Sequence, residues 1–214
     1  GITNLWVNPN TIYKKIKAND EKWIVSQECA KKLEFFGKEI VIEGDIKGKD
    51  LIGKFVKAPH TEQEIPIFEA EFVESGMGTG LVMSVPAHAP KDYQALMDLK
   101  LKNHELASKI EPVPIIVTEG YGEIPAKDVC EKLGVTDQID TKLEKATEEL
   151  YLKEYTNGKL NEKCGDFVNE KVEFGRNKVK DWLESKNQLE TFPTLLNAPI
   201  RCRCGAECVV KILN

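Results

Sequence analysis

The sequence predicts an α+β domain in which a small, barrel-like β core carries peripheral helices. Three observations point to this fold. Short strand patterns separated by Gly and Pro turns fill the first hundred residues, one helical pattern interrupts them, and helical periodicity dominates the second half. The 214 residues are 41% hydrophobic and 30% charged, which is enough to bury one sizeable core. This composition excludes a disordered tail, a collagen-like chain and a mini-protein that depends on disulfides.

The first half opens with a strand–helix–strand pattern. A short strand is expected at 23–25, followed by Ser26 as the N-cap of a helix. That helix is expected to end near residue 36, because Gly37 is suited to the position just beyond a helix end. Residues 39–44 then alternate as a half-buried strand does.

A glycine-rich turn joins the next two predicted strands. Residues 65–73 form a strand pattern that runs into the turn 75–80, and residues 81–85 leave the turn as an apolar strand. A helix is expected over 91–100, after a link that contains two prolines. This link therefore lies at one end of the predicted β core.

The second half is expected to be mainly helical. Its predicted elements are a strand at 113–117, a helix from Pro125 to about Gly134, helices over 142–156 and 169–185, and loop and strand over 192–213. The sequence has no internal repeat and no low-complexity linker. We therefore expect one domain over 1–190 and an exit segment over 191–214.

The charge distribution limits the kind of partner. Thirty basic and 35 acidic residues give a net charge of −5, and within residues 1–60 the 11 Lys and 8 Asp or Glu give +3. Proteins that neutralise many phosphates usually have a strong basic excess, so a nucleic acid would be held locally or by other parts of an assembly. Apolar runs are shorter than the roughly 20 residues that span a bilayer, and the N-terminus does not resemble a signal peptide. A cytoplasmic location without a membrane partner is expected.

The six cysteines fall into two groups. Cys29, Cys130 and Cys164 are scattered and are expected to be free thiols in a reducing compartment. Cys202, Cys204 and Cys208 cluster near the C-terminus. Three ligands are too few for a closed zinc site, which normally has four. The spacing alone therefore predicts no metal site.

The most informative stretch covers residues 78–93. Its Gly78-Thr79-Gly80 lacks a third glycine and precedes a strand, so it is typical of a turn rather than of a dinucleotide-binding loop. His88 and Asp92 follow at the strand-to-helix link, where side chains face the mouth of a barrel. From the residues alone, a structural His88 and a helix-capping Asp92 compete with a functional pair.

Three motifs together carry a resemblance. They are Thr3-Asn4-Leu5-Trp6-Val7-Asn8-Pro9, Gly78-Thr79-Gly80-Leu81-Val82-Met83-Ser84-Val85-Pro86-Ala87-His88-Ala89-Pro90-Lys91-Asp92-Tyr93 and Glu119-Gly120-Tyr121-Gly122-Glu123. Over essentially its whole length, the chain resembles the editing domain (CP1 insertion) of archaeal and eukaryotic leucyl-tRNA synthetases. Isoleucyl and valyl enzymes usually carry His where this chain has Met83. Met83 thus favours the leucyl branch, and the isoleucyl or valyl branch is the alternative.

The resemblance implies the editing-domain fold of class I aminoacyl-tRNA synthetases and an aminoacyl-tRNA hydrolase. Such a domain hydrolyses isoleucyl-, methionyl- or norvalyl-tRNA(Leu), because the synthetic site cannot strongly reject near-isosteres of leucine. Asp92 is then expected to hold the α-amino group, and His88 and Thr79 complete the expected catalytic set. The residues expected to bind substrate are Gly78, Gly80, Met83, Val85, Met77 and Lys91.

The resemblance also implies partners and cofactors. The partners are the 3′ end of tRNA(Leu) with its non-cognate amino acid and the remainder of the synthetase chain. Water is the attacking group, so editing is expected to need no metal or other cofactor, whereas the parent ligase uses ATP and Mg. In related synthetases, cysteines on the exit side of this insertion pair with others on the entry side. Cys202 and Cys204 are therefore candidates for half of a split zinc site, beside free thiols and a disulfide.

The chain departs from the family at its start. A threonine-rich element, Thr-x-Arg-Pro-Glu-Thr, precedes the Gly-x-Thr-Asn-Leu-Trp stretch in the family, whereas this sequence begins at Gly1. That element blocks leucine and helps to orient the ester, so we expect an excised fragment whose independent activity is in doubt. A passive module that binds the tRNA 3′ end is the second hypothesis, and a zinc-dependent interaction module is the third.

Overall fold

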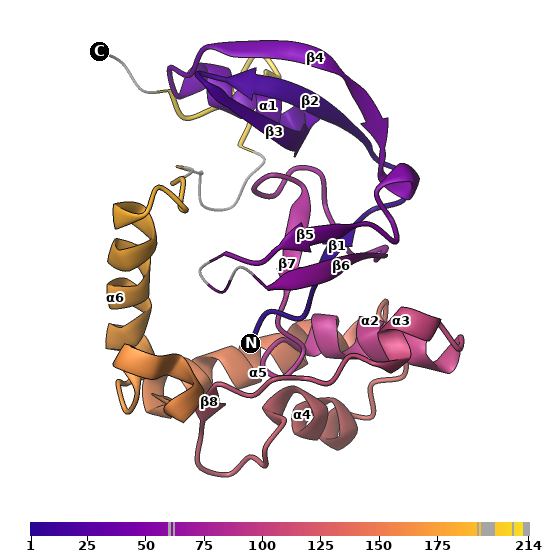
Figure 1. Ribbon diagram of the computed structural model, residues 1–214, viewed down its shortest axis with the longest axis vertical. Helices are drawn as coiled ribbons and strands as arrows, with labels where there is room; N and C mark the ends of the chain where they lie inside the picture. The colour runs from indigo at the N-terminus through magenta and orange to yellow at the C-terminus, as the bar shows by residue number, and fades with distance from the viewer. Residues whose placement is uncertain (60, 62, 192, 194–199, 207, 212–214) are drawn as a thin grey trace.

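The computed structural model describes residues 1–59, 61, 63–191, 193, 200–206 and 208–211. Two sheets lie above a layer of helices, and a further helix stands along one side (Figure 1). The three-stranded sheet has the order β3-β2-β4, from Glu21–Ser26, Ile12–Ala18 and Ile40–Lys47. The four-stranded sheet has the order β5-β6-β1-β7, from Phe55–Lys57, Glu64–Glu69, Asn4–Val7 and Leu81–Ser84.

Helix α1 (Gln27–Phe35) covers one face of the three-stranded sheet. Ser26 begins the helix, since its Oγ accepts a hydrogen bond from the N–H of Cys29 at 3.0 Å. Gly37 follows the helix with φ of 77°, which suits glycine because it has no Cβ. Leu33 of α1 packs on Ile16 of β2, and both side chains are fully buried. The sequence predicted this strand, cap and helix end.

The four-stranded sheet separates two cores, because successive side chains of a strand point to opposite faces. Its central strand β1 pairs in parallel with β6 and antiparallel with β7. On one face, Trp6 and Phe68 pack against Leu96 of α2 (Pro90–Leu101). On the other face, Val7 packs with Tyr13 of the three-stranded sheet. The end of β7 therefore lies beside the helical layer.

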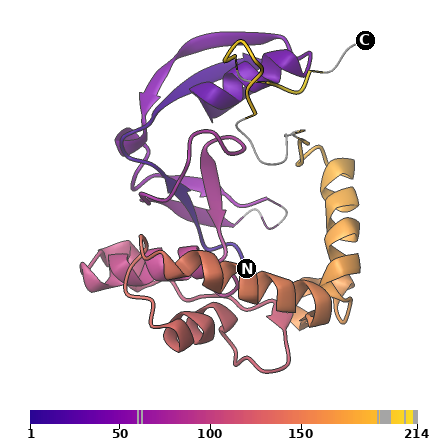
Figure 2. The same cartoon turned by 180° about the vertical axis from the view of Figure 1, so that it is seen from behind.

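The helical layer is built on α2, α4 (Pro125–Leu133) and α5 (Lys142–Asn157). Val129 and Leu150 are fully buried between α4 and α5. Seen from behind, α5 runs beneath the sheets and α6 (Val172–Ser185) stands along one side (Figure 2). The smaller elements are α3 (Glu105–Ser108), the β8–β9 pair (Ile116–Val117 and Lys159–Leu160), and 3₁₀ turns η1 (Gly48–Asp50) and η2 (Glu162–Phe167).

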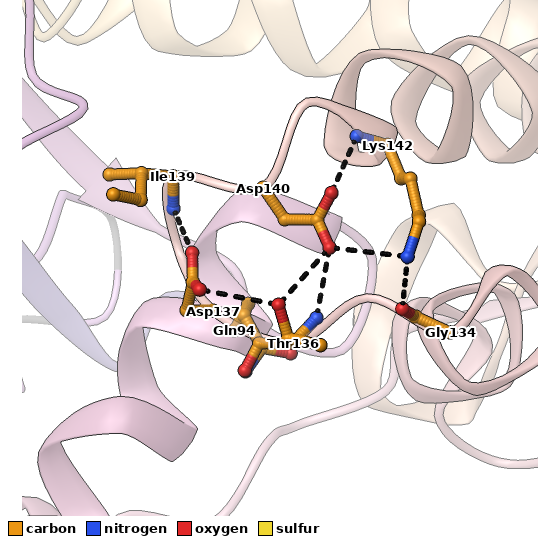
Figure 3. A network of polar contacts seen from close by, with 7 residues as sticks. All are labelled: Gln94, Gly134, Thr136, Asp137, Ile139, Asp140 and Lys142. Carbon is orange, nitrogen blue, oxygen red and sulfur yellow. Dashed lines mark hydrogen bonds and ion pairs between the residues drawn. The ribbon is translucent and has the colours of Figure 1, made fainter.

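A polar network fixes the loop between α4 and α5 (Figure 3). The Asp140 carboxylate accepts hydrogen bonds from the backbone N–H groups of Lys142 (2.9 Å) and Thr136 (3.1 Å). These bonds, the Lys142 amide first, hold the pKa of Asp140 below its ordinary value. Lys142 Nζ donates to the Gly134 carbonyl at 2.7 Å, and Gln94 Nε2 of α2 donates to the Thr136 carbonyl at 3.3 Å. The loop thereby connects α4 and α5 to α2.

The α+β class, the strand 81–85 and the helices over 91–100, 125–134, 142–156 and 169–185 agree with the prediction to within a few residues. The strand predicted over 65–73 ends at Glu69, and that over 113–117 is reduced to Ile116–Val117. The closed ring of a barrel is not among the strand pairings of the described residues, and the barrel-like closure stays a prediction.

The end of the chain lies partly outside the described residues. Of the predicted loop and strand over 192–213, positions 192, 194–199, 207, 212 and 213 are not described. The remainder pairs locally: the Cys202 N–H donates to the Ala206 carbonyl at 2.9 Å, and the Cys208 N–H donates to the Ile200 carbonyl at 2.7 Å. The boundary between residues 190 and 191 stays a prediction. Within the described part of the chain, no helix combines the length and apolar character that a membrane crossing needs.

Candidate active site

Asp92 lies at the junction where β7 leads into α2, and it is 4% exposed. Its Oδ1 accepts a hydrogen bond from Trp6 Nε1 of β1 at 3.0 Å. Its Oδ2 accepts one from the backbone N–H of Val85 at 2.8 Å. Asp92 lies in the first turn of α2, as the capping alternative expects, but the N-cap residue is Ala89 and both hydrogen bonds of the Asp92 carboxylate go to groups outside the helix. The carboxylate instead joins the sheet to the junction.

The electrostatics of Asp92 are those of a buried carboxylate without a cation. Burial disfavours the charged form and raises the pKa of Asp92 to about 6, against the opposing effect of the Val85 and Trp6 hydrogen bonds. Within the described residues, no Lys, Arg or His forms an ion pair with Asp92. An opposite charge within about 4–6 Å of this carboxylate would favour its charged form. The site is therefore suited to a positively charged ligand group.

His88 lies in the same junction and is 5% exposed. Its Nε2 accepts hydrogen bonds from the backbone N–H groups of Ile115 (2.8 Å) and Ile116 (3.3 Å), since an amide N–H can only donate. The ring proton therefore lies on Nδ1, which is 2.7 Å from Glu154 Oε1 of α5. Both ring nitrogens are engaged within the protein, so the geometry gives His88 a positioning role. Its catalytic role stays a prediction.

The Gly78-Thr79-Gly80 turn lies at the opposite end of β7 from Asp92. Val85 lies five positions after Gly80, which corresponds to about 16 Å along a strand. Gly80 has φ of 77°, and a Cβ added there would lie 2.7 Å from Ser26 Cβ. Thr79 Oγ1 donates to the Leu81 carbonyl at 3.3 Å, and Thr79 lines a cavity of about 560 Å³ with the β2–β3 turn. The structure thus does not bring Thr79 to Asp92, and its catalytic role stays a prediction.

The remaining expected residues differ in their availability. Met83 of β7 is 50% exposed and lies opposite Leu5 of β1, so it can contact a ligand between the turn and the junction. Val85 is half-buried at the junction itself. Met77 is exposed in the glycine-rich turn. Lys91 Nζ forms an ion pair with Glu144 at 2.8 Å, on the outside of α5.

Comparison with known proteins decides the family. A family model described as "Leucyl-tRNA synthetase, editing domain" matches residues 13–113. Leucine–tRNA ligases of Methanococcus maripaludis and Methanocaldococcus jannaschii are 45% and 41% identical to this chain, across all of it. The chain belongs to the leucyl-tRNA synthetase editing domain family. It spans about a quarter of these relatives, 24% of each.

Solved structures confirm the fold of the editing domain. The structure of GlLeuRS-CP1 is 29% identical, with a TM-score of 0.78 over 92% of this chain and 80% of that one. The editing domain of the P. falciparum cytosolic leucyl-tRNA synthetase shares the fold, with a TM-score of 0.80 at 21% identity over 87% of this chain and 72% of that one. The leucyl branch that Met83 favoured is confirmed.

The cysteines of the editing domain are placed as follows. Cys29 and Cys130 are buried free thiols, and burial raises their pKa to about 11 and about 12, which keeps them protonated. Cys164 is a partly buried free thiol. Cys202 and Cys204 are joined by a disulfide, and their Cα atoms are 5.4 Å apart. No group of three or more His, Cys, Asp or Glu in the described residues could hold a metal. Zinc is bound by Cys thiolates, so a split zinc site would need the reduced Cys202–Cys204 pair and ligands from elsewhere, and it stays a prediction.

Sequence reasoning missed two groups that the structure brings to the junction. Glu154 is 4% exposed and contacts His88, and it follows Leu143 and Leu150 on the buried stripe of α5. A carboxylate on an apolar helical stripe is a signal that could have found it. Tyr151 lies one turn before it. Partial burial, and then the charges of Asp92 and Glu154, raise the pKa of Tyr151 to about 12.

Proposed function

We propose that this editing domain hydrolyses the ester bond of tRNA(Leu) that carries a non-cognate amino acid, as part of a leucine–tRNA ligase. The observation that carries the proposal is the buried, cation-free carboxylate of Asp92, fixed by Trp6 and Val85 at the end of β7. An aminoacyl ester has an α-ammonium group beside its scissile carbonyl. A charge-assisted contact with Asp92 would therefore hold the ester at a defined position.

The proposed reaction is hydrolysis by water. The water oxygen bonds to the carbonyl carbon, the bond from that carbon to the ribose oxygen breaks, and a proton passes to the ribose oxygen. The protein binds and orients the amino acid through Asp92, and the ribose hydroxyl and backbone groups position the water. We propose that this step needs no cofactor, and that the ATP and Mg of the ligase act outside this chain.

Selectivity would come from two sites that act one after the other, the synthetic site of the ligase and then this editing site. One methylene in an apolar pocket contributes only about 1–3 kcal/mol, so a synthetic site for leucine admits close analogues. Isoleucine, methionine and norvaline are the proposed amino acids, and half-exposed Met83 and Val85 lie on the path from the turn to Asp92. The partners under this proposal are the tRNA 3′ end and the rest of the synthetase, in the cytoplasm.

The test replaces Asp92 in the full-length protein that contains this chain. Asp92→Ala is expected to abolish most release of isoleucine from isoleucyl-tRNA(Leu), while charging with leucine continues. The melting temperature is measured alongside, so that loss of hydrolysis is separated from loss of fold. A variant that clears mischarged tRNA at the wild-type rate would remove Asp92 from the mechanism. A wild-type protein that binds the tRNA without releasing the amino acid would favour the passive module.

A further inference from the structure

The link between β7 and α2 is fastened on two sides. It makes a tight turn in which the N–H groups of His88 and Ala89 both donate to the Val85 carbonyl, at 2.9 and 3.0 Å. On one side, the Val85 N–H donates a hydrogen bond to Asp92 Oδ2 at 2.8 Å. On the other side, the His88 ring reaches the 115–116 segment and Glu154. The position of the Asp92 carboxylate therefore depends on how His88 is held.

Glu154 is the group that holds the His88 ring. Its side chain is 5% exposed and that of His88 is 6% exposed, so water does not compete for their 2.7 Å contact. Within the described residues, the Glu154 carboxylate forms no ion pair with Lys or Arg, and its one hydrogen-bond partner is His88. A buried carboxylate needs such a donor to offset its desolvation. The pair is thus a specific contact rather than a surface ion pair.

The two amide donors at Nε2 show what Glu154 does. With the proton on Nε2, the ring N–H would point at the Ile115 N–H, donor against donor, and that partly buried N–H would lose its acceptor. By accepting a hydrogen bond from Nδ1–H, Glu154 favours the one neutral tautomer in which Nε2 can accept. The ring can then connect α5, the 115–116 segment and the junction at once. The Ala126 N–H, which donates to the Ala87 carbonyl at 3.1 Å, fastens the same junction to α4.

We propose that Glu154 is a positioning residue for ester hydrolysis: through His88 it fixes the junction that presents Asp92 to the α-ammonium group of the substrate. The inference rests on the proposed function. Loss of Glu154 lets the ring rotate or change tautomer, and the junction relaxes. Asp92 then binds the ammonium less well in ground and transition states alike. Such a loss raises KM and leaves kcat nearly unchanged.

The experiment measures release of isoleucine from isoleucyl-tRNA(Leu) by the full-length protein. For Glu154→Ala we expect kcat/KM to fall by up to about 100-fold, the loss that a misplacement of about 1 Å can cause, and to fall mainly through KM. Glu154→Gln keeps an oxygen acceptor for Nδ1–H and is expected to restore most of the loss. Leu150→Ala is the matched control on α5, since Leu150 is fully buried without a polar contact. It is expected to lower the melting temperature without raising KM.

A second measurement keeps the proposal testable if Glu154→Ala does not fold. Nitrogen-15 NMR of the wild-type His88 ring is expected to show a protonated Nδ1 and an unprotonated Nε2. A proton on Nε2 would overturn the proposal. If the wild type releases isoleucine, a Glu154→Ala variant with wild-type KM and kcat would overturn it as well. A wild type that releases no isoleucine contradicts the proposed function instead, and the NMR result then still tests the tautomer.

Discussion

The pH dependence of stability tests the buried charge of Asp92 directly. Its carboxyl group has a pKa of about 6 in the folded protein, above the ordinary value of 3.8, because burial disfavours the charge. The folded state therefore holds this proton more firmly than the unfolded state does. The stabilisation from this group is complete below pH 3.8 and is lost as pH rises through 6. At 1.36 kcal/mol per pKa unit, the stabilisation that is lost between low pH and pH 8 amounts to about 3 kcal/mol.

Asp92→Ala removes this titration together with two hydrogen bonds. The Trp6 and Val85 donors lose their acceptor, which costs about 1–3 kcal/mol each at any pH. At pH 8 the wild type also carries the cost of burying a charged carboxylate, and the variant does not. At pH 4 this cost is almost absent, because Asp92 is protonated in the folded protein. The destabilisation by Asp92→Ala should therefore be about 2–3 kcal/mol larger at pH 4 than at pH 8.

The assay is urea unfolding of the 214-residue chain and its variant at both pH values, with equal m-values as the condition for comparison. Leu96→Ala is the control, because Leu96 is a fully buried, non-titrating residue on the same helix. Its destabilisation should be the same at both pH values. An Asp92→Ala effect that does not change with pH would refute the reasoning, since the carboxylate would then be as well solvated in the fold as outside it.

Three further outcomes are expected. Trp6→Phe removes the indole donor to Asp92 and should raise the pKa of that carboxyl above about 6, as followed by carbon-13 NMR titration; an unchanged pKa would show that the contact is weak. In thermal melts, Gly80→Ala should destabilise the fold by more than the roughly 1–2 kcal/mol that an alanine costs in the left-handed conformation, because its Cβ would clash with Ser26. The control Gly78→Ala should stay within that range, because a Cβ at Gly78 has no neighbour within 4 Å. The 214-residue chain should bind tRNA weakly, and a filter-binding titration should show a steep decline with salt, because only residues 1–60 carry a basic excess; tight, salt-independent binding would contradict this.

Local signals in the sequence predicted those elements whose ends are chemically marked. Ser26 and Gly37 delimit α1, and Gly134 ends α4 in the left-handed conformation. Strand β2 (Ile12–Ala18) carried no such signal. Its buried residues Tyr13, Ile16 and Ala18 do not follow the period-2 alternation by which a strand is recognised. Strand β1 (Asn4–Val7) is buried on both faces and does not alternate either.

Only the part of the site that is local in the sequence was predictable. Asp92 and His88 share one short motif, so the sequence alone placed them together. Glu154 and Trp6 come from 66 and 86 residues away in the chain, and only tertiary packing brings them to the junction. Thr79 shows the converse. It is close to Asp92 in sequence, yet the length of β7 carries it to the other end of the sheet.

The most direct test of the editing function compares two substrates of the full-length protein. Release of amino acid is measured from isoleucyl-tRNA(Leu) and from leucyl-tRNA(Leu) under identical conditions, with wild type and Asp92→Ala in parallel. If this chain is a hydrolytic editing domain, the wild type clears the isoleucyl ester, spares the leucyl ester and loses the first activity with Asp92. Wild-type protein that holds the isoleucyl-tRNA and leaves its ester intact would contradict this account.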